Sequence, residues 1–350
     1  MLSQAKERDY LFDNYKALLI FLVVVGHFIE PCYKNNEFLY FLKWLIVSFH
    51  MPAFIFISGY FSKKEIPISK MIQKLLVPYF VYEVIYYLLY VYIIDKPTGL
   101  YLFYPKFSLW YILALFFWRV ITPFVKKIPH HMILSIVGGL LIGCSGMADN
   151  FLSIPRVLVF YPFFLAGIHF DRKKLEAYRI KKGNMLATIG AVMFALYLAF
   201  DAGHTNYSPK IFYGRYNYEF LNQGILEGVL VRLLCYAAGF GMTFALLLLI
   251  SEKRTKLSYI GSRTMAIYLF HGLTYSLIKG TSDVLASVNT VTETLLLLCI
   301  CFAVMMIFSK KEFTTFTNGI SSVSCRNVHD TIIELLGSCK VTERDLVYGK

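Results

Sequence analysis

Long apolar runs recur from one end of the chain to the other, and they limit the folds that it can adopt. Each run approaches the ~20 residues that cross the roughly 30 Å hydrocarbon core of a bilayer. The 350 residues are 57% hydrophobic and 16% charged, which leaves too little polar surface for a soluble domain of this length. Inside lipid, a helix satisfies its own backbone polar groups. The sequence therefore predicts an all-α fold, a polytopic bundle of about ten transmembrane helices.

The expected spans are close to the bilayer core in length, and polar or basic residues bound most of them. They cover residues 15–31, 38–61, 75–94, 107–122, 131–145, 154–170, 185–203, 225–250, 257–279 and 290–309. The span at 131–145 is the weakest, because it is short and rich in glycine. Residues 1–311 are expected to form the membrane domain. Residues 312–350 are expected to be a polar, poorly ordered cytoplasmic tail.

Basic residues indicate the orientation, because Lys and Arg are enriched in cytoplasmic loops. With the N-terminus inside, the cytoplasmic loops hold twenty of them, whereas the outer loops hold five: Lys34, Lys96, Lys106, Lys210 and Arg215. Both termini are therefore expected in the cytoplasm. The net charge of +13 follows from this distribution, so the expected partner is the lipid bilayer and not nucleic acid. The seven cysteines show no metal or disulfide spacing, and no metal is expected.

An ionisable residue in or beside an apolar span is costly and is therefore a candidate for function. Asp13 and Lys16 lie at the start of the first span, and His27 follows Lys16 by three helical turns. Lys16 and His27 therefore share a helix face about 16 Å apart, with Lys16 near the cytoplasmic surface. A neutral imidazole accepts a proton from a hydroxyl group, so His27 is a candidate general base. A histidine that only links two helices is the alternative.

The second span contains a proline, and lysines follow its end. Pro52 removes a helix hydrogen bond, and Ser58 and Gly59 are expected in a small-residue turn near the cytoplasmic end. The lysines beyond this turn could hold phosphates as point charges. The proposed donor site comprises Ser58, Lys63, Lys64, Lys70 and Lys74. The positive-inside rule alone would also place lysines there.

Further polar residues fall on the outer side, at the expected depth of His27. Arg156 opens the sixth span, Arg232 lies early in the eighth, and His271 lies in the outer half of the ninth. One such residue could extend its charge to the interface, but three at one depth indicate a polar cavity. The aromatic residues of the 201–224 loop are typical either of an interfacial belt or of a sugar-stacking platform.

These motifs together resemble the integral-membrane acyltransferase-3 family, over about residues 8–309, and are closest to its fucose 4-O-acetylase-like branch. The first-helix motif runs from Phe12-Asp13-Asn14-Tyr15-Lys16 to Gly26-His27-Phe28. The other matching stretches are Phe49-His50-Met51-Pro52, Ser58-Gly59-Tyr60, Leu109-Trp110-Tyr111, Pro162-Phe163-Phe164-Leu165-Ala166-Gly167 and Tyr268-Leu269-Phe270-His271. The motifs of the first two helices are specific, and the later ones are weak when taken alone.

The resemblance implies an enzyme that transfers an acyl group, usually acetyl from acetyl-CoA, to a sugar hydroxyl of a surface polysaccharide or its lipid-linked precursor. Acetyl-CoA is then a co-substrate, no permanently bound cofactor is implied, and the location is a bacterial cytoplasmic membrane. By carry-over, His27, Asp13 and Lys16 are catalytic, with Lys16 in place of the family's usual Arg. The acceptor-binding residues are His50, Trp110, Tyr111, Arg156, Arg232 and His271.

The chain departs from the family after the Ser-Gly motif. The family commonly shows Arg-x-x-Arg there, whereas this chain has Lys70 and Lys74 at a different spacing. Lysine keeps the attraction to phosphate but lacks the bidentate grip of arginine. Two other classes of function remain open: a transporter or lipid-linked sugar flippase without acyl-transfer activity, and a non-enzymatic sensor or scaffold. The absence of visible internal repeats counts against a transporter.

Overall fold

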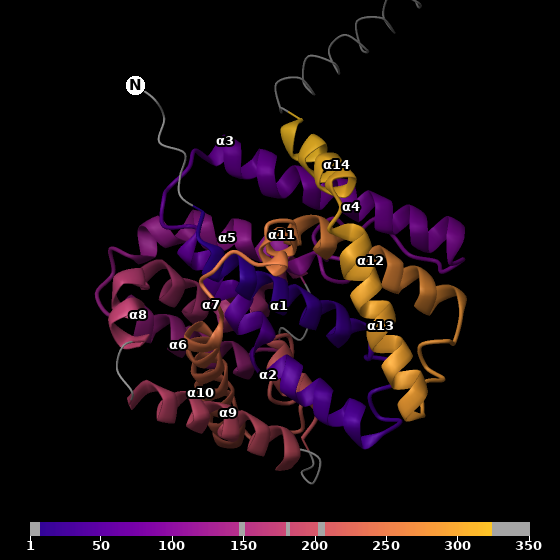
Figure 1. The fold of residues 1–350 in the computed structure, drawn as a ribbon. Coiled ribbons are helices and arrows are strands. Elements are labelled where there is room, and N and C mark those ends of the chain that lie inside the picture. Colours follow the sequence, from indigo (N-terminus) through magenta and orange to yellow (C-terminus); the bar gives the residue numbers. More distant parts are fainter. Residues whose placement is uncertain (1–7, 147–150, 180–182, 202–206, 324–350) are drawn as a thin grey trace, which may run out of the picture.

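The computed structural model describes residues 8–146, 151–179, 183–201 and 207–323, and these residues form helices joined by loops (Figure 1). The helices are α1 (Tyr10–Phe28), α2 (Glu37–Tyr60), α3 (Ile68–Met71), α4 (Val77–Leu88), α5 (Trp110–Val125), α6 (His131–Leu141), α7 (Ile154–His169), α8 (Arg172–Arg179), α9 (Gly183–Asp201), α10 (Ile225–Leu249), α11 (Lys256–Gly261), α12 (Thr264–Thr281), α13 (Val291–Phe308) and α14 (Lys311–Ser322). No strand occurs among the described residues, so the all-α prediction is confirmed.

Six helices among the described residues are long and apolar enough to cross a membrane. They are Tyr10–Phe28, Glu37–Tyr60, Ile68–Ile93, Phe151–His169, Ile225–Leu249 and Val291–Phe308. The third joins α3 and α4 through π-helical turns at Ile72–Leu76 and Leu89–Ile93. Shorter apolar helices lie at Trp110–Val125, His131–Cys144 and Thr188–Tyr197. These helices support an integral membrane protein, whereas the total of about ten crossings stays a prediction.

The core is built around α1, which packs against α2, α11, α12 and α13. Beside it, α2 crosses α7 so closely that only glycine fits at the contact. A Cβ on Gly59 would lie 2.0 Å from the carbonyl oxygen of Phe164, and one on Gly167 would lie 1.9 Å from that of Phe56. The predicted small-residue turn at Ser58 and Gly59 is therefore wrong. Gly59 lies inside α2 and allows two backbones to approach, as small residues do between membrane helices.

The contacts of the helix ends define two opposite ends of the bundle. At one, named here the clamp end, the start of α1 meets the segment that follows α10, through hydrogen bonds from Asn14 to the carbonyl oxygens of Ser251 and Lys253. The ends of α2, α5 and α7 also lie there. At the other, named the cavity end, the loop after α1 meets α2 through the Glu30–Lys43 ion pair. The helices α1, α2, α5, α7 and α10 thus run between the two ends in the directions expected from the predicted order of crossings. Which end faces the cytoplasm stays a prediction.

Two expected boundaries differ from the structure near the clamp end. The span at 257–279 is divided into α11 and α12, because Gly261 lies against α1, where a Cβ would come 1.7 Å from the carbonyl oxygen of Asp13. The first helix begins at Tyr10 and not at residue 15, since ion pairs satisfy the charges of its first turns.

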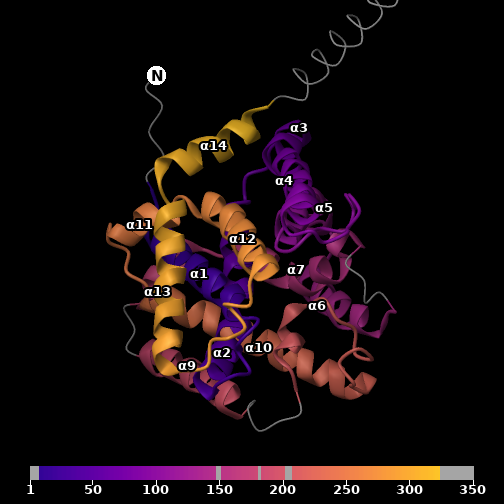
Figure 2. The ribbon, with the colours of Figure 1, turned by 90° about the vertical axis from the view of Figure 1, so that its right-hand side faces the viewer.

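The start of the expected tail is also ordered, because α14 covers Lys311–Ser322. Its aromatic side chains explain this correction: the ring of Phe313 lies 4.9 Å from those of Phe270 and Phe308, and the ring of Phe316 lies 5.9 Å from that of Phe270. In Figure 2, α14 lies across the bundle between α12 and α4, both of which it contacts. The rest of the expected tail, residues 324–350, lies outside the described residues.

Candidate active site

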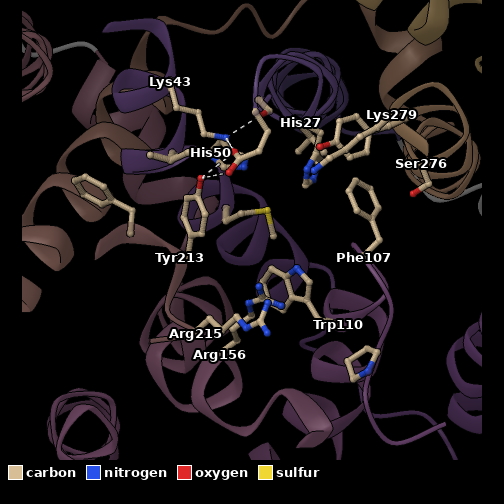
Figure 3. Close-up of a pocket in the computed structure, with 18 of the residues that line it drawn as sticks. His27, Lys43, His50, Phe107, Trp110, Arg156, Tyr213, Arg215, Ser276 and Lys279 are labelled. Carbon is tan, nitrogen blue, oxygen red and sulfur yellow. Dashed lines mark hydrogen bonds and ion pairs between the residues drawn. The ribbon is translucent and has the colours of Figure 1, made fainter. Parts of the chain in front are cut away.

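A cavity of about 790 Å³ opens at the cavity end, between the end of α1, the start of α2 and the loops around them (Figure 3). Four of the predicted site residues line it: His27, His50, Trp110 and Arg156. Tyr213 and Tyr216, from the aromatic 201–224 loop, line it as well. Further polar and aromatic residues of its lining were not selected as site residues by the sequence analysis, among them Glu30, Lys43, Phe107, Arg215, Tyr275, Ser276 and Lys279. The structure therefore brings together side chains from α1, α2, α5, α7, α12 and the 207–224 loop.

His27 lies in the last turn of α1, with its imidazole ring in the wall of the cavity. Its ring centroid lies 4.5 Å from that of Phe107 and 6.1 Å from that of Tyr275. The ring of His271 lies 5.4 Å away on the buried side. These rings hold the imidazole in place from several directions, while the cavity gives it access to a bound molecule.

The two other histidines near His27 are held by their own helices. His50 places Nδ1 2.7 Å from the carbonyl oxygen of Ile46, and His271 places Nδ1 3.0 Å from that of Ile267. A carbonyl oxygen only accepts, so each Nδ1 carries the hydrogen and each Nε2 is left as an acceptor. The Nε2 of His271 is buried and has no hydrogen-bond partner among the described residues. Both rings can therefore accept a hydrogen bond near His27.

An ion pair between the buried Lys43 and the half-buried Glu30 fixes the turn that carries His27. The ammonium group of Lys43, whose residue is 3% exposed, pairs with Glu30 and donates to the carbonyl oxygen of Gly26 at 2.7 Å. The Tyr213 hydroxyl donates to Glu30 at 3.0 Å. Burial and the Glu30 carboxylate raise the pKa of Tyr213, so this hydroxyl keeps its proton. The sequence analysis missed Lys43, although a lysine inside an apolar span was itself a signal.

Three predicted acceptor residues do not line this cavity: His271, which lies behind His27, Arg232 and Tyr111. Arg232 donates to the carbonyl oxygens of Gly139 at 3.0 Å and Tyr216 at 2.9 Å, and it lies over the ring of Tyr218. It therefore supports the loop that lines the cavity. The hydroxyl of Tyr111 lies 2.5 Å from that of Ser58, which joins a predicted acceptor residue to a predicted donor residue.

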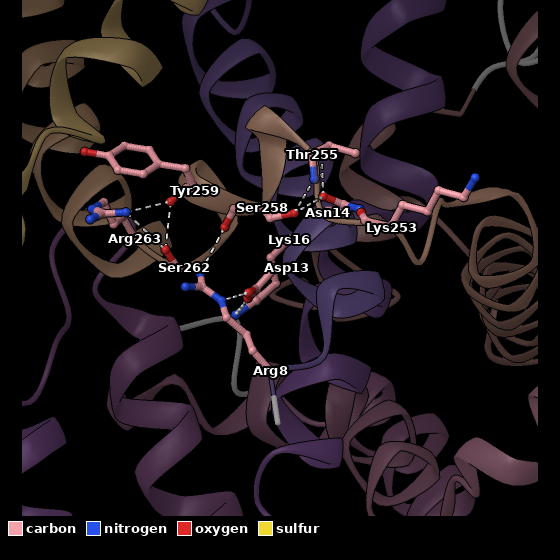
Figure 4. A network of polar contacts seen from close by, with 10 residues as sticks. All are labelled: Arg8, Asp13, Asn14, Lys16, Lys253, Thr255, Ser258, Tyr259, Ser262 and Arg263. Carbon is pink, nitrogen blue, oxygen red and sulfur yellow. Dashed lines mark hydrogen bonds and ion pairs between the residues drawn. The ribbon is translucent and has the colours of Figure 1, made fainter. Parts of the chain in front are cut away.

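Asp13 and Lys16 lie at the clamp end, in a network of polar contacts at the start of α1 (Figure 4). The carboxylate of Asp13 pairs with Arg8 at 2.5 Å and with Lys16 at 3.0 Å. Arg8 also donates to the carbonyl oxygen of Ser258 at 3.1 Å. An α-helix rises 1.5 Å per residue, so about 16 Å separate the backbone of Lys16 from that of His27. The structure therefore does not bring these three predicted catalytic residues together.

The four predicted donor lysines are exposed near the clamp end. Lys63 donates to the carbonyl oxygen of Phe170, and Lys64 lines a second cavity, of about 290 Å³. Two further cations, Arg119 and Lys126, also line this cavity. Lys70 and Lys74 lie outside it, on α3 and the π-helical turn that follows. In the described part of the chain, no group of three or more His, Cys, Asp or Glu residues is placed to hold a metal ion.

The sequence of this chain is similar to those of known acyltransferases. A family model described as an acyltransferase domain, acyltransferase-3, matches residues 9–310. The nodulation protein NolL of Sinorhizobium fredii (strain NBRC 101917 / NGR234) is 40% identical over 65 residues. That match spans 18% of this chain and 18% of NolL. No solved structure matches the chain.

Proposed function

Because the chain belongs to the acyltransferase-3 family, as the match over residues 9–310 establishes, we propose that it is an O-acetyltransferase that uses acetyl-CoA and acts on a sugar hydroxyl. The family membership makes it an acyltransferase and places it in a lipid bilayer. The acetyl donor, the carbohydrate acceptor and the bacterial cytoplasmic membrane are parts of the proposal. Membership of the fucose 4-O-acetylase-like branch stays a prediction.

The observation that carries the proposal is the place of His27 in the wall of the large cavity. In the proposed reaction, a ring nitrogen of His27 takes the proton of the acceptor hydroxyl while the hydroxyl oxygen attacks the carbonyl carbon of the thioester. The carbon–sulfur bond then breaks, and the thiolate leaves with the proton that the imidazolium returns. The products are a sugar ester and the free thiol of CoA, and His27 returns to its neutral form.

The acceptor is proposed to enter from the cavity end. Phe107, Trp110, Tyr213 and Tyr216 line the cavity. Aromatic faces of this kind stack on the apolar faces of sugar rings, while nearby polar groups bind hydroxyls. Because Glu30 accepts from Tyr213 and pairs with Lys43, these two hydrogen-bonding residues are held in position beside the place where the hydroxyl would react.

The donor is proposed to enter from the clamp end, where Lys63, Lys64, Lys70 and Lys74 attract its phosphates. A chain of side chains leads from there toward His27. Ser58 bonds to Tyr111, the ring of Tyr111 lies 5.6 Å from that of Tyr268, and the ring of Tyr268 lies 5.8 Å from that of His271. The part of acetyl-CoA that carries the acetyl group would pass along these side chains to reach His27. The hydrogen bond between Ser58 and Tyr111 would have to break to let it through.

Purified protein given acetyl-CoA and cell-envelope glycan tests the proposal. We expect release of free CoA thiol that depends on the glycan, together with acetyl ester on the glycan. A transporter or a scaffold would release no CoA beyond the rate of spontaneous hydrolysis, and that result would reject the proposed function.

A further inference from the structure

The basic residues of the large cavity are not equivalent. Lys96 and Lys279 are exposed at its rim, and Lys43 is paired with Glu30. Arg156 and Arg215 reach the same corner beneath Trp110 in Figure 3, and their charges repel each other. Among the described residues, Glu30 is the one carboxylate that lines the cavity, and Lys43 and Tyr213 already hold it. The corner therefore carries an excess of positive charge.

Aromatic rings hold both guanidinium groups in place. Arg156 lies 4.7 Å from the ring centroid of Trp110, and Arg215 lies 5.6 Å from that of Tyr216. Such cation–π contacts restrict the orientation of each planar group, and both arginines line the cavity. The Nε of Arg215 is buried and has no hydrogen-bond partner in the described part of the chain. A buried guanidinium nitrogen without a partner is costly, so the protein leaves this guanidinium group, which lines the cavity, incompletely satisfied.

The loop that carries Arg215 is itself fixed. Gly214 has a φ of +64°, and a Cβ there would also lie 2.9 Å from the ring of Phe160. On the other side, Arg232 holds the carbonyl oxygen of Tyr216. Two constraints therefore position Arg215 toward the cavity, although its backbone belongs to a loop.

We propose that Arg156 and Arg215 bind an anionic group, phosphate or carboxylate, on the acceptor molecule, so that the enzyme acts on a charged sugar. Two fixed guanidinium groups match the oxygens of such an anion through paired hydrogen bonds. The exposed Lys96 and Lys279 at the rim would attract the anion before it reaches the arginines. The inference rests on the proposed function for the identity of the acceptor, but binding can be measured without any turnover.

The test compares ligands that differ in charge, using the full chain in detergent and saturation-transfer NMR. The probes are glucose, glucose 1-phosphate, glucuronic acid, inorganic phosphate and CoA. We expect the wild-type protein to bind glucose 1-phosphate or glucuronic acid at least about tenfold more tightly than glucose, the scale of a charge-assisted hydrogen bond. The probe that gains more identifies the anion as phosphate or carboxylate.

Variants test whether Arg156 and Arg215 cause the tighter binding of the charged sugars. Arg215→Gln should remove most of it, Arg215→Lys should keep part of it, and CoA binding should be unchanged in both. The matched control is Lys34→Gln, which removes a charge from an exposed residue at the same end of the bundle that does not line the cavity. This control should bind as the wild-type protein does.

Three results would overturn the inference. The wild-type protein could bind the charged sugars no more tightly than glucose. This result would not depend on whether any variant folds. Arg215→Gln could weaken CoA and spare the sugar phosphate, which would make the corner a donor site. Inorganic phosphate could bind as tightly as glucose 1-phosphate, which would indicate an unspecific anion site. Absence of acyl transfer alongside charge-dependent sugar binding would reject the proposed function and leave this inference standing.

Discussion

At the clamp end, Asn14 uses its whole side-chain amide in hydrogen bonds, whereas at the cavity end His27, Arg156 and Arg215 face an open volume. The amide nitrogen of Asn14 donates to two carbonyl oxygens, and its oxygen accepts from Thr255 and Ser258 at 2.7 Å each. Polar groups that satisfy one another stabilise a structure. Polar groups that face an open volume can bind a molecule that enters it.

The residues of the first-helix motif lie at both ends of the bundle. Asp13, Asn14 and Lys16 belong with His27 in the pattern along the first helix, yet the first three join α1 to its neighbours at the clamp end. Only His27 reaches the large cavity. We therefore propose that the acidic and basic members of the motif act by fixing α1 and by their charge near the donor, at a distance from the reacting atoms.

The sharpest test of the two ends is the side of the membrane on which each lies, because the expected result is all or none. In a background with the native cysteines replaced by serine, Lys34→Cys at the cavity end should react with an impermeant thiol reagent in intact cells. Lys127→Cys at the clamp end should react only after the cells are opened. The reverse pattern would invert the proposed entry routes of donor and acceptor.

The largest effect on turnover is expected at the cavity end. His27→Ala should lower kcat by roughly 10²–10⁴-fold, the range of a lost general base, with the amount of folded protein unchanged. The control is His131→Ala, which removes a half-buried histidine at the clamp end, where its Nε2 lies 2.8 Å from that of His169. Its rate should stay near that of the wild-type protein. Near-normal acyl transfer by the His27 variant would contradict the mechanism.

The clamp end should respond in stability and not in chemistry. Asn14→Ala leaves four groups without their partner, and we expect a loss of about 1–3 kcal/mol in the free energy of unfolding. Thermal unfolding in detergent measures this, and kcat per folded molecule should change only a few-fold. Asn35→Ala is the matched control, because Asn35 also donates to two carbonyl oxygens but is exposed. A larger loss in the control would remove the distinction between the two ends.

The smallest effect is expected at the exposed lysines. Replacing Lys70 and Lys74 together by Gln should raise the KM for acetyl-CoA several-fold and leave the acceptor KM unchanged, because exposed charges attract phosphate weakly and are screened by salt. The wild-type donor KM should therefore rise with ionic strength, and that of the double variant should rise less. Lys127→Gln should behave as the wild-type protein. An unaltered donor KM and salt response in the double variant would move the search to Lys64, Arg119 and Lys126.

Several features of the site followed from local sequence signals. His27, His50, Trp110 and Arg156 were selected as ionisable or aromatic residues in motifs, and all four line one cavity. Lys43 could have been found by the same rule, since it lies inside an apolar span. Glu30 could also have been found by this rule, because it lies at the end of the expected first span. Phe107 and Arg215 could not, because single aromatic or basic residues are common at the ends of spans and in loops.

The sequence by itself determined that the chain is helical and belongs in a membrane, because hydropathy over ~20 residues is a local property that lipid enforces on every span. It also determined the family, through motifs that lie within single helices. The tertiary structure decided which polar groups meet. Arg232 was expected to face an acceptor but is held by carbonyl oxygens of other segments, and α11 separates from α12 where Gly261 meets α1. Arg232 lies 16 positions from Tyr216 and 93 from Gly139, and Gly261 lies 248 from Asp13, so no local pattern along the chain contains these contacts.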